Sequence, residues 1–130
     1  MEDIKYITIS EKNDAMLQQR KNRNLLGNKH DLWRAAALIG LKIDPSFALN
    51  KKEKNLINRS ADNKAQNIIR SQIDESGDIA FIINEYAPDE DGHTYRKMQA
   101  LIHLGLSKIR EDYIEDGVLD WDGVQSLFEK

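Results

Sequence analysis

The first residues of the chain change from a β-branched and aromatic run, typical of a strand, to a helical pattern of apolar positions. Residues 4–9 (Ile-Lys-Tyr-Ile-Thr-Ile) are mostly β-branched or aromatic and predict a short strand, with Ile7 and Tyr6 on opposite faces. Residues 11–23 then favour a helix. The asparagines around Gly27 predict a break after that helix.

The best-defined helix of the sequence follows this break. Asn28 can cap it, and we expect it to end at Gly40, before a turn at residues 44–46. Residues 50–59 hold only two apolar positions and predict an exposed basic segment, whose conformation we leave open. The apolar positions that recur at helical spacing in the best-defined helix are Leu32, Ala35, Ala36 and Ile39.

Helical patterns continue through the second half of the chain. A helix is predicted from residue 60, with Ser60 as its cap, to residue 73. Residues 79–86 suit a strand as well as a helix, but apolar side chains at positions i, i+3, i+4 and i+7 favour the helix. A long helix over residues 94–114 and a last helix from about Asp120 complete the pattern.

These elements predict one mainly α domain, residues 1–130, built as an irregular bundle of about five or six helices with one short N-terminal β-strand. Hydrophobic residues make up 40% and charged residues 32% of the chain, which is typical of a folded domain. The predicted core includes Leu32, Ala36, Ile39, Ile68, Ile69, Ile82, Ile102, Ile109 and Leu127.

Charge changes this picture because the two halves of the chain carry opposite sign. Residues 1–70 hold fourteen Lys/Arg and eight Asp/Glu, a net charge of +6, and residues 71–130 hold five and fourteen, a net charge of −9. A basic surface attracts polyanions, whereas an acidic surface repels nucleic acid and attracts basic surfaces. The sequence therefore indicates a binding protein with two kinds of partner.

The basic half is the candidate nucleic-acid-binding region, because clustered Lys and Arg neutralise phosphates. Its candidate residues are Arg20, Lys21, Arg23, Lys29, Lys51, Lys52, Lys54 and Arg59. The acidic half is the candidate surface for a basic protein partner. Its candidate residues are Asp89, Glu90, Asp91, Glu111, Asp112, Glu115 and Asp116. For both groups the alternative is an ordinary solvated surface.

No motif for catalysis or metal binding stands out. The chain has no cysteine, which excludes disulfides, thiolate metal sites and cysteine nucleophiles. No two of its three histidines lie four residues apart on one predicted helix, and the acidic residues 89–91 lack the spacing of an EF-hand. No Gly-x-Ser-x-Gly motif or Gly-rich phosphate loop occurs. We predict no catalytic residue, metal or cofactor, and keep an enzyme with a dispersed site as an alternative.

The longest apolar run, residues 35–39, is far shorter than a membrane span. The first residues contain neither the basic nor the apolar region of a signal peptide. We therefore expect no membrane contact and a cytoplasmic protein.

A strand followed by two helices is also the order of elements in ribbon-helix-helix regulators, which bind DNA with strands paired between two chains. If residues 4–9 formed such a ribbon, the protein would be a homodimer and a transcriptional regulator. The outward face of the strand would present Tyr6 and Thr8, which offer few groups for base recognition.

Residues 29–42, Lys-His-Asp-Leu-Trp-Arg-Ala-Ala-Ala-Leu-Ile-Gly-Leu-Lys, are similar to a pattern in small accessory proteins of bacterial DNA phosphorothioation (dnd) gene clusters. There a lysine–aspartate pair precedes a helix with an aromatic residue, two apolar residues, Ala-Ala, a Gly and an aromatic residue or leucine. The resemblance covers about residues 28–128, and its specific part is 33–42.

The long helix departs from the pattern of those proteins, since residues 98–102 read Met-Gln-Ala-Leu-Ile where a Glu-Glu-Tyr-Ala-Asn-like run is expected. The resemblance implies a shared fold and a non-enzymatic accessory role in DNA modification or defence, through binding of protein or DNA. It carries no catalytic residue across.

Overall fold

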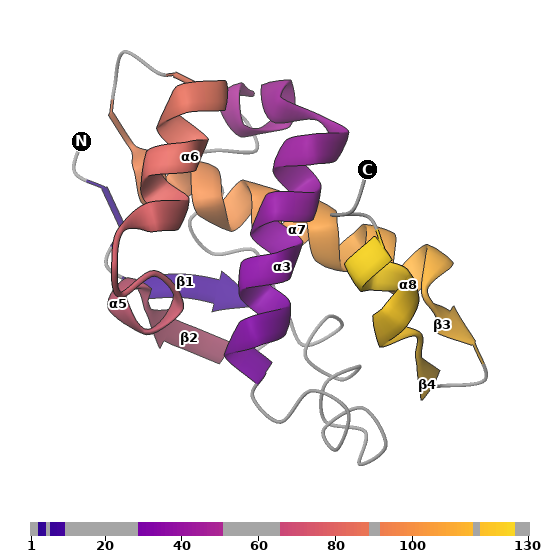
Figure 1. Ribbon diagram of the computed structural model, residues 1–130. Helices are drawn as coiled ribbons and strands as arrows, with labels where there is room; N and C mark the ends of the chain where they lie inside the picture. The colour runs from indigo at the N-terminus through magenta and orange to yellow at the C-terminus, as the bar shows by residue number, and fades with distance from the viewer. Residues whose placement is uncertain are drawn as a thin grey trace.

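Two helices that cross near the middle of the molecule, α3 and α7, organise the fold (Figure 1). The structure, a computed structural model, describes residues 3–4, 6–9, 29–50, 66–88, 92–115 and 118–126. Its elements are β1 (Tyr6–Ile9), α3 (Lys29–Ile43), the 3₁₀ helix η1 (Pro45–Leu49), β2 (Gln66–Ile69), α5 (Arg70–Ile73), α6 (Asp78–Tyr86), α7 (Thr94–Asp112), β3 (Ile114–Glu115), β4 (Val118–Leu119) and α8 (Trp121–Ser126).

This architecture is mainly helical, as the sequence predicts, and the short N-terminal strand is confirmed. The helices predicted over residues 79–86 and 94–114 and from about residue 120 are also confirmed, as α6, α7 and α8. The helix predicted over residues 11–23 and the basic segment from residue 51 to 59 lie outside the described residues.

Glycines bring the backbones of α3 and α7 into direct contact. A Cβ atom at Gly105 would overlap with the carbonyl group of Ala36, and a Cβ atom at Gly40 would overlap with the carbonyl group of Leu101. The prediction that α3 ends at Gly40 is therefore wrong. The helix continues to Ile43, because this glycine allows close packing inside the helix and does not terminate it.

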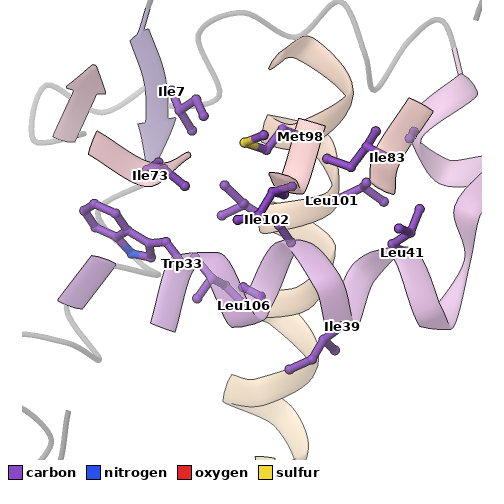
Figure 2. Packing of buried hydrophobic residues seen from close by; sticks show 14 of the residues in the cluster. Ile7, Trp33, Ile39, Leu41, Ile73, Ile83, Met98, Leu101, Ile102 and Leu106 are labelled. Carbon is purple, nitrogen blue, oxygen red and sulfur yellow. The ribbon is translucent and has the colours of Figure 1, made fainter. Parts of the chain in front are cut away.

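The core lies around the α3–α7 contact and draws side chains from β1, α5 and α6 as well. Figure 2 shows Ile7, Ile73, Met98 and Leu106 around Ile102. Of the predicted core, Ile82 is partly buried, Leu127 lies outside the described residues, and the burial of Ile68 and Ile69 stays a prediction. The predicted core residues that are buried are Leu32, Ala36, Ile39, Ile102 and Ile109.

Strand β1 pairs antiparallel with β2 of the same chain, with Ile7 opposite Ile68. The helix predicted over residues 60–73 is therefore wrong at residues 66–69, and only the single turn of α5 is helical there. Pairing with β1 satisfies backbone groups of β2, and its two isoleucines suit a strand. One edge of β1 is therefore paired within the same chain, and a ribbon-helix-helix dimer would have to use the other edge.

Helix α6 depends on a carboxylate that precedes it in the chain. Its N-cap residue, Gly77, has no side chain and adopts a left-handed backbone with φ of 81°. Instead, the buried Asp74 accepts hydrogen bonds from the backbone N–H groups of Ile79 (3.0 Å) and Ala80 (2.9 Å). These bonds satisfy donors that the first turn of a helix leaves without partners and fix where α6 begins.

Candidate interaction surface

Most of the candidate nucleic-acid-binding residues lie outside the described part of the chain. Lys29 is the first residue of α3, and nothing in the structure relates it to the other seven. DNA binding by the basic half therefore stays a prediction. The candidates outside the described residues are Arg20, Lys21, Arg23, Lys51, Lys52, Lys54 and Arg59.

Two arginines of the basic half form contacts that stabilise the fold. Arg34 of α3 donates hydrogen bonds to the carbonyl oxygens of Ile73 (Nε, 2.7 Å) and Gln72 (Nη2, 2.9 Å), where α5 ends. Arg70 lies with its guanidinium carbon 4.4 Å from the centroid of the Tyr95 ring, a cation–π contact between α5 and α7. These contacts hold the guanidinium groups of both arginines against the protein.

The candidate partner-binding residues that the structure describes lie at the end of α7. Glu111 and Asp112 are exposed, and Asp112 forms an ion pair with Lys108 one turn earlier. The hydrogen bond and the charge of Asp112 raise the pKa of Lys108 above its ordinary value. Glu115 belongs to β3, and the remaining candidates, Asp89, Glu90, Asp91 and Asp116, lie outside the described residues.

Two of the five cations in the second half of the chain are withdrawn from the surface. Arg96 is 4% exposed and Lys97 is fully buried. The Nζ atom of Lys97 donates hydrogen bonds to Oδ1 of Asn84 (2.9 Å) and to the carbonyl oxygen of Ala87 (2.8 Å). Ala87 follows the last residue of α6, so the ammonium group lies at the negative end of that helix dipole.

The described part of the second half buries these two cations and one carboxylate, Asp74, so its surface is more acidic by one charge than a count of its residues suggests. Sequence reasoning missed this because polar residues of a helix are expected on its solvated face. Helix α7 instead buries every residue from Arg96 to Ile102, so burial in this part of the helix extends beyond its apolar stripe and includes the two cations. The exposed carboxylates in the described part are Glu75, Asp78, Glu85, Glu111, Asp112, Asp120 and Asp122.

A hollow with a volume of about 660 Å³ lies where the chain enters α6. Its carboxylates outnumber its single cation, Arg34, which is held by carbonyl oxygens. Asp74 is occupied with capping α6, which leaves the carboxylates of Glu75 and Asp78 exposed to solvent. The residues that line this acidic hollow include Arg34, Ile73, Asp74, Glu75, Ser76 and Asp78.

Metal-binding side chains are not clustered in the described part of the chain. That part contains no group of three or more His, Asp or Glu placed to hold a metal ion. His93 and His103 lie at the start and in the middle of α7, and the predicted acidic turn at 89–91 lies outside the described residues. Within the same ranges, no helix is long and apolar enough to cross a membrane.

Comparison with known proteins adds no relative: no family model, no curated protein and no solved structure matches this chain.

Proposed function

We propose that this chain is a non-enzymatic accessory protein of a bacterial DNA-modification or defence system, and that it works by binding. The observation that carries this proposal is the separation of charge along the chain, +6 in residues 1–70 and −9 in residues 71–130. Burial of Arg96 and Lys97 strengthens it, because it removes positive charge from the surface of the acidic half.

The acidic half is the part of this proposal that the geometry supports best. Exposed carboxylates on α6, α7 and α8 repel the phosphates of nucleic acid and attract a basic protein surface. We therefore assign protein binding to this half. The basic half is the complementary candidate for DNA, whose phosphates dominate affinity and make it dependent on salt.

The assignment to DNA modification or defence rests on the resemblance of residues 29–42 to the dnd accessory proteins. In the structure these residues form most of α3, and Trp33, Ala36 and Ile39 are buried in the core. Side chains of this kind support a similar fold. Because they are packing residues, the resemblance carries no catalytic residue to this chain.

Capture of the proteins encoded beside this gene tests the protein-binding half of the proposal. The purified chain should retain a basic partner at about 0.1 M salt and lose most of it at about 1 M, because the Debye length falls from about 10 Å to about 3 Å. Equal capture at both salt concentrations would indicate an apolar interface and contradict the electrostatic account. Absence of any partner at low salt would contradict protein binding.

A gel-shift series at two salt concentrations tests the basic half separately. Reversal of Lys51, Lys52 and Lys54 to Glu should weaken binding to all DNA sequences alike and flatten its salt dependence. Substitution of Lys108 by Glu, a charge change of the same sign outside the basic half, is the control and should weaken binding much less. Unchanged binding after the triple reversal would place the DNA contact elsewhere.

A further inference from the structure

Helix α6 exposes its two aromatic side chains. Phe81 is 67% exposed and Tyr86 is 70% exposed, the largest values among the large hydrophobic residues that the structure describes. The buried side of the helix carries Ile79 and Ile83, which pack into the core. Exposed aromatic groups that do not support the core are typical of interaction sites, where they contribute much of the binding energy.

Helical geometry places these aromatics at the two edges of one continuous face, with Tyr86 beside the buried Ile79. With about 100° between successive residues, the order around the helix is Phe81, Glu85, Asp78, Ile82 and Tyr86, within about 140°. Ile82 is half-buried, and the two carboxylates are exposed. The largest side chains of this face are therefore apolar or aromatic, and its charged groups are carboxylates. Along the axis it is about 12 Å long, at a rise of about 1.5 Å for each of the steps from Asp78 to Tyr86.

The acidic hollow lies at the beginning of this same face. Asp78 belongs to both, since it lines the hollow and lies between the two aromatics around the helix. Glu75 adds a second exposed carboxylate at the hollow. A concave acidic site next to an aromatic surface fits a long cationic side chain whose neighbours are apolar.

We propose that the outer face of α6 and the acidic hollow together bind a segment of a partner protein that carries Lys or Arg beside an apolar residue. This inference rests on the proposed function and names the contact surface within it. The cationic side chain enters the hollow against Glu75 and Asp78, and the apolar residue packs on Phe81 and Tyr86. A nucleic acid does not fit here, because its phosphates would face exposed carboxylates.

Photo-crosslinking identifies the partner segment. Benzoylphenylalanine in place of Phe81 is irradiated in cells that contain the neighbouring genes, with Gln125 as the control position. Gln125 is exposed and belongs to α8, which lies at the opposite end of the molecule from α6 (Figure 1). The expected adduct forms at position 81 and attaches to a segment with Lys or Arg within a few residues of an apolar side chain. An adduct to a second copy of this chain or to nucleic acid, or no adduct at position 81, overturns the proposal.

Binding of a synthetic peptide with the crosslinked sequence then tests the aromatic part and the acidic part of the α6 surface separately. Phe81→Ser should weaken binding about tenfold, as for a central aromatic contact. Glu75→Lys should weaken it at about 0.1 M salt and much less at about 1 M. Glu111→Lys makes the same charge change at the end of α7 and should have little effect. All three positions are exposed, so an unchanged melting temperature confirms folding.

The outcomes separate this inference from the proposed function. Capture of a basic partner that Phe81→Ser leaves unchanged, or that Glu111→Lys weakens more than Glu75→Lys, overturns the α6 surface while the proposed function stands. Failure of the unmodified protein to capture any basic partner overturns both.

Discussion

The carboxylate of Asp3 accepts a hydrogen bond from the backbone N–H of Tyr95 at 2.9 Å, although 92 positions separate the two residues. The same carboxylate accepts a second bond, at 3.1 Å, from the N–H of Arg96. His93, the residue at the N-cap position of α7, makes no capping bond with its side chain. The beginning of the central helix is therefore held by a residue near the start of the chain.

Asp3→Ala should lower the free energy of unfolding by about 1 kcal/mol, within the range of about 0.5–2 kcal/mol for loss of an N-cap. Asp3→Asn is the matched control and should cost less, because its amide oxygen can still accept one of the two bonds. Urea unfolding of the three proteins measures the difference. Equal stability of Asp3→Ala and the unmodified chain would mean that this cap does not operate in solution.

Close packing of α3 on α7 predicts that replacement of Gly105 destabilises the protein. Sequence alone would treat this glycine only as a residue that disfavours a helix. Gly105→Ala should destabilise the protein by about 1–3 kcal/mol, because its Cβ would overlap with the carbonyl group of Ala36. In an ordinary helix the same change would stabilise, by about 1 kcal/mol. Ser107→Ala on the same helix is the control. A stabilising effect of Gly105→Ala in chemical unfolding would contradict the close contact.

The sequence predicts the helices well wherever a long apolar stripe exists. Helix α7 and the start of α3 are examples, because their periodic positions are the ones that pack against each other. The sequence-based prediction fails at residues 66–69. Four residues fit the period of a helix as well as that of a strand, and the partner strand lies about sixty positions away. It also fails at Gly40, because only the packed structure shows that a helix backbone approaches there.

The candidate surface was harder to predict for a similar reason. The spacing of residues 79–86 places Tyr86 on the apolar side of α6 with Ile79 and Ile83. In the structure Tyr86 is the last residue of the helix and lies beyond the core, so its ring is exposed. Burial of Lys97 depends on Asn84 and Ala87 from the preceding helix and turn. The charge asymmetry of the two halves follows directly from the sequence, but the positions of the exposed charges on the surface depend on the fold.

Packing of the N-terminal strand predicts a difference between its two faces. Ile7 is fully buried and Tyr6 is 53% exposed. Ile7→Ala should cost about 2–5 kcal/mol of stability, as for a large-to-small change in a core. Tyr6→Ala should cost less than about 1 kcal/mol. Thermal and urea unfolding measure both, and similar losses for the two variants would contradict docking of β1 on the core.

The Lys108–Asp112 pair predicts a local dependence on pH. Asp112 raises the pKa of Lys108 above 10.5, first through its hydrogen bond and then through its charge. Since the folded pKa is the higher one, the contribution of the pair to stability is complete below the unfolded pKa and disappears as the pH rises through the folded pKa. An NMR titration of Lys108 should show a midpoint above 10.5 that falls in Asp112→Asn. The same midpoint in both proteins would contradict the pair.

Lys97 offers a test of how a buried ammonium group is held. Lys97→Met keeps most of the volume but removes the bonds to Asn84 and Ala87, and should cost about 1–3 kcal/mol for the buried carbonyl left without this donor. Lys97→Ala removes the volume as well and should cost about 2 kcal/mol more, because a cavity remains.

Asn84→Ala separates the two acceptors of Lys97. Asn84 is exposed, so its removal should cost less than Lys97→Met, in which the carbonyl of Ala87 loses its partner inside the protein. Urea unfolding orders the three variants. If Lys97→Met proves as stable as the unmodified chain, the buried lysine contributes through its aliphatic stem, and its bond to the end of α6 contributes nothing measurable.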